Sequence, residues 1–318
     1  MTQDYLNALP ESEGMSTITP LTSTMEPLRP LKVDRKTQVM AIINVTPDSF
    51  SGGRNISKLD ETLTEIGTTL GSPTVTIVDI GGQSTAPGAI SVNASVEASR
   101  AVPLIKKLQS GGAGIIVRDR FAISIDTYYA SVAKEAVEAG ADIINDVTAG
   151  VKDPDMLPTM ARLGKTVVLM HMRGDPSNMN KLTDYPGGLI PTIASELLDR
   201  VEAAEQAGIR RWRIILDPGI GFAKTGEQNL EILRRFDELR NWPGLRGFPW
   251  LVGSSRKNFI GKVTGVTEPK QRLMGTSATV AAAIFGGADI VRVHDTEQMV
   301  QVAKMSDAIW RPGALTRQ

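Results

Sequence analysis

A short β-branched apolar run that ends in a polar side chain recurs along this chain, and it constrains the fold more than any other feature. The runs end at Asn44, Asp79, Asp126, Asn145, Asp217 and His294. Parallel α/β enzymes keep their chemistry at such positions, where a strand ends before a turn rich in glycine and proline. One polar end can be accidental, whereas many converging ones predict a single shared site.

These runs are candidate strands, and helix-compatible stretches separate them. The expected strands are 38–44, 75–81, 121–126, 142–147, 166–171, 213–217, 250–253 and 290–293. The expected helices are 58–70, 93–109, 130–139, 155–163, 189–207, 227–240, 271–286 and 295–309. Regular β/α alternation with right-handed crossovers predicts an α/β fold of the (β/α)8 TIM-barrel class.

An open, doubly wound sheet is the alternative for the same alternation of elements. Its dinucleotide-binding form requires a Gly-x-Gly-x-x-Gly turn after the first strand. The segment after the first expected strand is instead Asn44-Val-Thr-Pro-Asp-Ser-Phe50. A chain of 318 residues could also form two smaller domains, but the regular strand spacing favours one barrel.

Charge and composition exclude several classes of function. Lys plus Arg and Asp plus Glu both number 35, and there is no long basic run, so a nucleic-acid partner has no electrostatic support. The absence of cysteine excludes disulfides, thiolate nucleophiles and Cys-ligated zinc. With only His171 and His294, a histidine-cluster metal site is excluded as well.

The first 36 residues differ from the rest of the chain. Residues 1–36 carry four prolines and many Ser and Thr without a hydrophobic period, so we expect a linker or disordered arm before a barrel domain at 37–318. The arm is too acidic for a mitochondrial presequence and lacks the order of a signal peptide. No apolar stretch is long enough to span a bilayer. We therefore expect a soluble, cytoplasmic protein with no membrane partner.

Several polar positions follow successive or alternating strands, so a barrel would aim them at one mouth. These positions are Asp126, Asn145, Asp217, Lys257, Arg292 and His294. A single carboxylate at a strand end more often caps the next helix or bonds to the barrel rim. Capping does not explain the whole set, which instead predicts a site.

This combination resembles the dihydropteroate synthase family. The matching segments, in the family's order across about residues 38–310, are Asn44–Phe50, Asp79–Thr85, Ser124–Thr127, Ile144–Asp146, Leu169–Met172, Asp217–Phe222, Ser255–Lys257 and Arg292–Asp295. The resemblance implies a TIM barrel that condenses 6-hydroxymethyl-7,8-dihydropterin diphosphate with 4-aminobenzoate and releases pyrophosphate in folate synthesis. It also implies a target of sulfonamides.

The resemblance assigns roles around the pterin. Asp217, Asn145 and Lys257 would hold the ring, because a carboxylate accepts from the ring donors, an amide complements either type, and an ammonium donates to the carbonyl. Asp126 would lie beside the ring and stabilise the positive charge that develops as the C–O bond to diphosphate breaks. Phe222 would form a wall of the pocket.

The leaving diphosphate needs cations and hydrogen-bond donors. The resemblance implies Arg292, whose planar guanidinium suits phosphate oxygens, and His294, two residues further along the same strand face. It implies Mg²⁺ as cofactor with Asn44 as an oxygen ligand, since Mg²⁺ takes few protein ligands besides waters and phosphates. The expected catalytic residues are thus Asp126, Lys257, Arg292 and His294.

Two loops implied to close over 4-aminobenzoate keep the family's Phe50, Thr85 and Pro87. Other positions depart from the family pattern: Gly52 lacks a usual aspartate, Gln83 replaces a usual glutamate, Ala86 replaces a usual arginine, and Asn258 replaces a frequent serine near the expected benzoate carboxylate. The pterin and diphosphate positions keep the pattern. The departures therefore bear on loop closure and turnover more than on binding.

Two alternatives to a synthase stay open. A methyltetrahydrofolate-binding methyltransferase domain shares the barrel and the carboxylate clamp, but it needs a corrinoid partner and no diphosphate, so Lys257 and Arg292 argue against it. A pterin-binding domain without synthase turnover is motivated by Gly52 and Ala86. Because family members are commonly dimers, a homodimer through the last helices is open, as is a place within a larger folate-synthesis protein.

Overall fold

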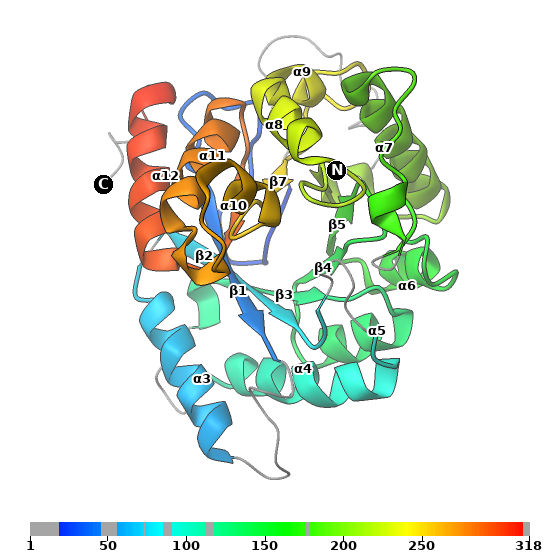
Figure 1. Ribbon diagram of the computed structural model, residues 1–318. Coiled ribbons are helices and arrows are strands. Elements are labelled where there is room, and N and C mark those ends of the chain that lie inside the picture. The colour runs from blue at the N-terminus through cyan, green and yellow to red at the C-terminus, as the bar shows by residue number, and fades with distance from the viewer. Residues whose placement is uncertain are drawn as a thin grey trace.

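A computed structural model describes residues 19–45, 56–72, 74–84, 91–111, 118–175 and 178–313. Its parallel strands form one eight-stranded sheet in the order β6-β5-β4-β3-β2-β1-β8-β7. The strands are β1 Gln38–Asn44, β2 Val75–Gly81, β3 Ala122–Asp126, β4 Ile143–Asp146, β5 Thr166–Met170, β6 Ile214–Asp217, β7 Leu251–Val252 and β8 Ile290–Val293. Helices surround this sheet (Figure 1). The predicted (β/α)8 TIM barrel is confirmed.

At least one helix follows each strand. The helices are α3 Ile56–Thr69, α4 Ala94–Gln109, α5 Ala130–Glu138, α6 Met156–Leu163, α7 Leu189–Gln206, α8 Gly226–Arg234, α9 Phe236–Arg240, α10 Asn258–Thr264, α11 Leu273–Phe285 and α12 Thr296–Trp310. A capping box fixes the start of α8, because the Thr225 hydroxyl accepts from Gln228 N at 3.2 Å and Gln228 Oε1 accepts from Thr225 N at 2.8 Å. The sequence predicts one helix over 227–240, but the chain breaks it at Arg235. In the described part of the chain, no helix has the length and apolar character that crossing a bilayer requires.

One position in each strand contributes to a single apolar layer inside the barrel. Its members are Met40, Ile77, Ala122, Ile143, Val168, Ile215, Leu251 and Ile290, together with Leu21 and Leu28 from the N-terminal arm. Layers of inward side chains are how such barrels fill their interior. The two arm leucines therefore seal the end of the barrel at which the strands begin.

The N-terminal arm, residues 19–36, is packed against the barrel. Thr19 and Leu28 exchange backbone hydrogen bonds of 3.0 and 2.8 Å, and Arg35 Nε donates to Asp289 Oδ1 at 2.8 Å. The sequence predicts a linker here because isolated leucines give no hydrophobic period. The packed part of the chain thus begins before residue 37, while residues 1–18 lie outside the described residues.

The barrel closes unevenly around its circumference. β1 pairs with β2 along nearly its whole length, from Val39 to Asn44. Between β6 and β7, the described residues pair only at an isolated bridge from Leu216 to Trp250, where Leu216 N donates to Pro249 O at 2.9 Å. A seam therefore separates these two strands.

Candidate active site at the barrel mouth

The carboxyl ends of the strands bring four polar side chains into direct contact. This mouth cluster consists of Asp79 from β2, Asp126 from β3, Asn145 from β4 and Arg292 from β8. Arg292 donates from Nε to Asp79 Oδ2 at 2.6 Å and from Nη2 to Asp126 Oδ2 at 2.7 Å. Asn145 Nδ2 donates to the same Asp79 oxygen at 3.1 Å. One guanidinium thus holds two carboxylates through charge-assisted hydrogen bonds.

Two carboxylate oxygens of the mouth cluster are left without a partner. Oδ1 of Asp79 and Oδ1 of Asp126 are buried and accept no hydrogen bond from any described residue. A buried acceptor without a donor is costly, so such an atom suits a hydrogen bond from a ligand N–H. Burial raises the pKa of Asp126 to about 7, with Arg292 opposing the shift and Asp79 adding to it.

A second wall of the mouth combines a carboxylate, an ammonium and an aromatic ring. Asp217 ends β6, and its Oδ1 accepts from Gly219 N at 2.7 Å. Lys257 Nζ donates to the Ile220 carbonyl and lies 4.6 Å from the centre of the Phe222 ring. Burial lowers the pKa of Lys257 to about 8, and Asp217 partly offsets that effect. Burial also raises the pKa of Asp217, which Lys257 opposes, so the two groups stabilise each other's charge.

Strained backbone holds Lys257 in place. The preceding residue, Arg256, has φ 60, a left-handed conformation that costs a non-glycine residue energy. Its N–H donates to Thr276 Oγ1 at 3.1 Å, and its Nε donates to Asp295 Oδ2 at 3.0 Å. Arg272 Nη1 donates to its carbonyl at 2.8 Å. These hydrogen bonds fix the backbone of the turn after β7, so Lys257 is pre-organised.

A buried chain of polar groups runs behind Asp217. Lys224 Nζ lies 2.9 Å from His171 Nδ1, and His171 Nε2 lies 2.8 Å from Glu196 Oε2. Arg173 Nη2 closes the chain on Glu196 Oε1 at 2.5 Å. Burial lowers the pKa of Lys224 to about 7 and that of His171 to about 4, so His171 is neutral and its Nδ1 accepts a hydrogen bond from Lys224.

A glycine makes this arrangement sterically feasible. Gly219 has φ 68, and a Cβ at that position would lie 1.9 Å from the His171 carbonyl oxygen. The turn after β6 therefore packs directly on the residue after β5. Any side chain at Gly219 would push Asp217 and His171 apart.

His294 is held in one orientation by Ser255. The Ser255 hydroxyl lies 3.0 Å from His294 Nδ1 and accepts from the His294 backbone N–H at 3.2 Å. Burial lowers the pKa of His294 to about 4, with Arg256 and Arg292 acting in the same direction, so the imidazole is neutral. Because the hydroxyl can then donate to Nδ1, the ring proton is assigned to Nε2, which becomes a donor.

The other predicted site residues lie further out. Asn44 ends β1 and is exposed, and Asn258 is exposed at the start of α10, where its Oδ1 accepts from Arg272 Nη1 at 3.0 Å. Gln83 is buried; it donates to Glu97 and accepts from the Tyr128 hydroxyl at 2.9 Å. The predicted loop residues Phe50, Thr85 and Pro87, like the departures Gly52 and Ala86, lie outside the described residues.

The described residues fit a metal held mainly by other ligands. They contain no group of three or more His, Cys, Asp or Glu side chains able to hold an ion. The Asn44 amide is a hard oxygen donor at the exposed end of β1, suited to Mg²⁺ that keeps waters and phosphate oxygens as its other ligands.

Three residues of the site received no role from sequence reasoning. Asp79 stands inside a matched motif at a strand end, which was a usable signal. Ser255 likewise stands inside the matched segment Ser255–Lys257, whereas Lys224 lies outside the matched segments and a lysine in a loop is ordinarily solvated. Only the fold reveals that Lys224 is buried beside His171 and that Ser255 orients His294.

Comparison with known proteins places these features in context. Residues 40–294 match the family model described as pterin binding enzyme. The chain is 45% identical to a dihydropteroate synthase of Synechocystis, over 87% of this chain and 91% of that protein. It is 48% identical to the folic acid synthesis protein fol1 of Pneumocystis carinii over 86% of this chain, which spans only 36% of that protein.

Solved structures of dihydropteroate synthases are also similar to this chain. A Clostridium difficile dihydropteroate synthase crystallised in the presence of pteroic acid has a TM-score of 0.78 and 40% identity, covering 87% of this chain and 98% of that one. A Xanthomonas albilineans dihydropteroate synthase with 4-aminobenzoic acid also has a TM-score of 0.78, at 34% identity, covering 93% and 98%.

Proposed function

We propose, on the premise that this chain belongs to the pterin-binding enzyme family and within it to the dihydropteroate synthases, that it joins 6-hydroxymethyl-7,8-dihydropterin diphosphate to 4-aminobenzoate. The products would be 7,8-dihydropteroate and pyrophosphate. The observation that carries this proposal is the mouth cluster, in which Arg292 is bonded to Asp79 and Asp126 while each carboxylate keeps one unpartnered buried oxygen.

The pterin would lie between the mouth cluster and the wall formed by Asp217, Lys257 and Phe222. Asp217 accepts from the ring's amino and amide donors, and Lys257 exchanges the Ile220 carbonyl for the ring carbonyl. The Asn145 amide is oriented by its hydrogen bond to Asp79, and it would donate to or accept from the edge of the ring. Phe222 packs on the ring face beside the Lys257 ammonium.

Charge separation follows from the same geometry. As the C–O bond to diphosphate breaks, positive charge develops on the pterin methylene and ring, and the Asp126 carboxylate, held by Arg292 and with its Oδ1 unpartnered, would stabilise that charge. Arg292 offers its remaining N–H donors to the leaving diphosphate, and His294 donates from Nε2. Both donors are pre-oriented, Arg292 by Asp79 and His294 by Ser255.

The chemical step needs no covalent enzyme intermediate. The neutral amine of 4-aminobenzoate attacks the methylene, the C–N bond forms, and pyrophosphate takes the electron pair of the broken C–O bond. The amine loses its proton after attack, so the protein need not supply a general base. Mg²⁺, when bound through Asn44 and phosphate oxygens, would neutralise charge on the leaving group.

A turnover assay tests the proposal. Purified protein receives both substrates and Mg²⁺, and pyrophosphate release is followed together with dihydropteroate formation. Stoichiometric release of both products supports the synthase. Tight pterin binding without turnover would instead support a pterin-binding domain, and pyrophosphate release that does not require 4-aminobenzoate would exclude the condensation.

We also propose that the protein forms a homodimer through the outer faces of α11 and α12. Met274 on α11 and Met305 and Ile309 on α12 are large apolar side chains that stay more than half exposed. Because α11 and α12 pack against each other, exposed apolar side chains on both helices favour an interface on this side of the barrel. Light scattering would give the oligomeric state, and Met305→Glu should convert a dimer into monomers.

A further inference from the structure

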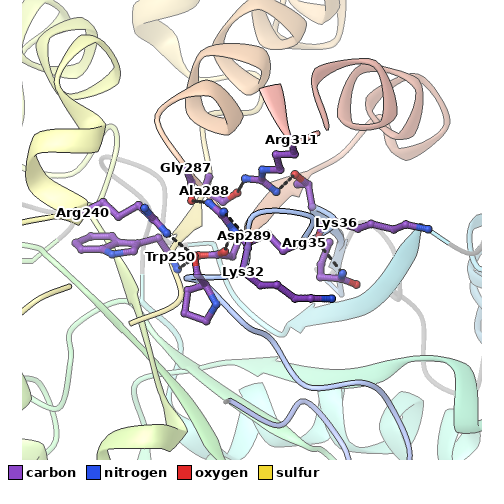
Figure 2. Close-up of polar contacts among 12 residues, drawn as sticks. Lys32, Arg35, Lys36, Arg240, Trp250, Gly287, Ala288, Asp289 and Arg311 are labelled. Carbon is purple, nitrogen blue, oxygen red and sulfur yellow. Dashed lines mark hydrogen bonds and ion pairs between the residues drawn. The ribbon is translucent and has the colours of Figure 1, made fainter. Parts of the chain in front are cut away.

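A cleft lies at the opposite end of the barrel from the mouth cluster, where the strands begin. This arginine pocket has a volume of about 300 Å³ and lies between the N-terminal arm, α9, and the ends of α11 and α12. Asp289, which precedes β8, stands behind it, and Figure 2 shows Arg35, Arg240 and Arg311 around this carboxylate. None of these residues belongs to the proposed synthase site.

The pocket is strongly cationic. Among the described residues, four arginines and no acidic side chain line it: Arg35, Arg240, Arg246 and Arg311. The carboxylates that compensate them stand behind the wall, where Asp289 pairs with Arg35 at 2.8 Å and Asp307 pairs with Arg311 at 3.1 Å. Arg240 and Arg246 form no ion pair with a described residue, and Asp289 is the carboxylate that acts on Arg240 from behind the wall. Four arginines thus share two carboxylates, which leaves an excess of positive charge at the cavity.

Arg240 is held in the pocket although its hydrogen bonds are incomplete. Its Nη2 donates to the Pro30 carbonyl, whereas its Nε is buried and has no partner among the described residues. Gly287, at φ 104, makes room for it, because a Cβ there would lie 2.7 Å from Arg240 Cδ and 2.9 Å from its Nε. Burial lowers the pKa of Arg240, and burial lowers that of Arg311 to about 10 with Arg35 adding to the effect. Burial disfavours the charged form of both groups, and Asp289 offsets only part of that effect.

One side of the pocket is apolar and aromatic. The rings of Phe285 and Trp310 meet edge to face with centroids 5.3 Å apart, and Phe285 is 67% exposed. Leu31 and Val33 of the N-terminal arm complete this rim. Exposed rings next to guanidinium groups form a surface that binds a flat aromatic body carrying an anion.

We propose that the arginine pocket is a second ligand site, which binds a small aromatic phosphate monoester. The phosphate sits on Arg240 and Arg246, and the ring packs on Phe285 and Trp310. A phosphate monoester carries close to two negative charges at neutral pH, which matches the excess of four arginines over the two carboxylates Asp289 and Asp307. A guanidinium fork fits phosphate oxygens bidentately, and the volume suits a small ligand.

Phenyl phosphate is the probe that tests this site in the full-length chain. Because Trp310 lines the pocket, binding should change tryptophan fluorescence saturably, and Trp310→Phe should remove that signal while calorimetry still detects binding. Arg246→Gln should raise the Kd about tenfold, the worth of one charge-assisted hydrogen bond. Arg246 is exposed and forms no hydrogen bond through its side chain to a described residue. The substitution should therefore leave the fold of the pocket wall unchanged.

Controls separate this site from the barrel mouth. Arg120→Gln removes an exposed arginine of η2 (Arg118–Arg120), outside the pocket lining, and should leave the Kd unchanged. Arg292→Gln should also leave the pocket signal intact, and benzyl alcohol, which lacks the charge, should not compete. The proposal is overturned if phenyl phosphate gives no saturable binding, or if Arg292→Gln abolishes binding while Arg246→Gln does not.

Discussion

Arg292 and Asp126, 166 residues apart in sequence, are joined by a hydrogen bond of 2.7 Å across the barrel mouth. The other oxygen of Asp126 is buried without a partner, and its carboxyl has a pKa raised to about 7 by burial. Arg292 is therefore the group that favours the ionised carboxylate near neutral pH. Loss of Arg292 would remove the proposed hydrogen-bond donor to the diphosphate and would also change the charge of Asp126, the carboxylate proposed to act in catalysis.

Arg292→Gln should reduce kcat about 10²–10³-fold, the usual effect of removing one donor aimed at developing negative charge. The fold should persist because Asp79 keeps its hydrogen bond from Asn145. Single-turnover kinetics at saturating substrate measure the change. Arg234→Gln, on the exposed surface of α8, is the matched control, and equal losses in both variants would contradict the assignment.

The pH profile of kcat/KM should be bell-shaped with its maximum between about pH 7 and 8. Asp126 must lose its proton, and its pKa is raised to about 7, so activity rises as pH passes through that value. Lys257 must keep its proton, and its pKa is lowered to about 8, so activity falls above it. Asp126→Asn should remove the acid limb, and a wild-type profile that stays flat from pH 5 to 7 would count against Asp126.

Asp217→Asn should weaken pterin binding by about 1.5–3 kcal/mol, since a charged acceptor becomes a neutral one. The turn should survive because an amide oxygen can still accept from Gly219 N. Calorimetric titration with a diphosphate-free pterin gives the affinity. Asp199→Asn, at an exposed position of α7, should leave affinity unaltered. Unchanged affinity in Asp217→Asn would remove that residue from the site.

Lys224 should make the protein more stable as pH rises from about 7 towards 10. Burial lowers its folded pKa from 10.5 to about 7, so in this window the unfolded chain binds a proton that the folded chain has released. Stability then increases with pH, by at most about 1.4 kcal/mol per pH unit for one group. Urea unfolding of Lys224→Met should show a smaller slope in that window. An identical slope would mean that Lys224 stays charged in the fold.

Removal of Mg²⁺ by a chelator should stop turnover and leave binding of a diphosphate-free pterin nearly unchanged. The metal is proposed to contact Asn44 and the leaving group rather than the ring. Asn44→Ala should accordingly raise the Mg²⁺ concentration needed for half-maximal rate. Full turnover in excess chelator would exclude the metal from the reaction.

The sequence predicted the barrel because each strand carries its own local signal, a β-branched run with a polar end. The same signal indicated Asp126, Asn145 and Asp217, since parallel strands must present their carboxyl ends together. It could not indicate that Arg292 would bond to Asp79, because that contact depends on β8 lying beside β1 and on the curvature of the closed sheet.

Structural features that depend on single residues outside any periodic pattern could not be predicted from the sequence. Leu21 and Leu28 lack the periodicity of a helix or strand, yet each fills one place in the layer at the barrel end. The buried position of Lys224 follows from the turn packing permitted by Gly219, a contact between segments 53 residues apart. No local pattern encodes either outcome.

At the seam between β6 and β7, the proposed pterin substrate would stabilise the barrel itself. Asp217 ends the strand on one side of the seam, and Lys257 follows the strand on the other. A rigid pterin ring bonded to both Asp217 and Lys257 would link these two strands, which backbone hydrogen bonds join at a single bridge. We therefore expect β6 and β7 to separate transiently in the ligand-free barrel. Bound pterin would reduce this motion and so stabilise the closed sheet.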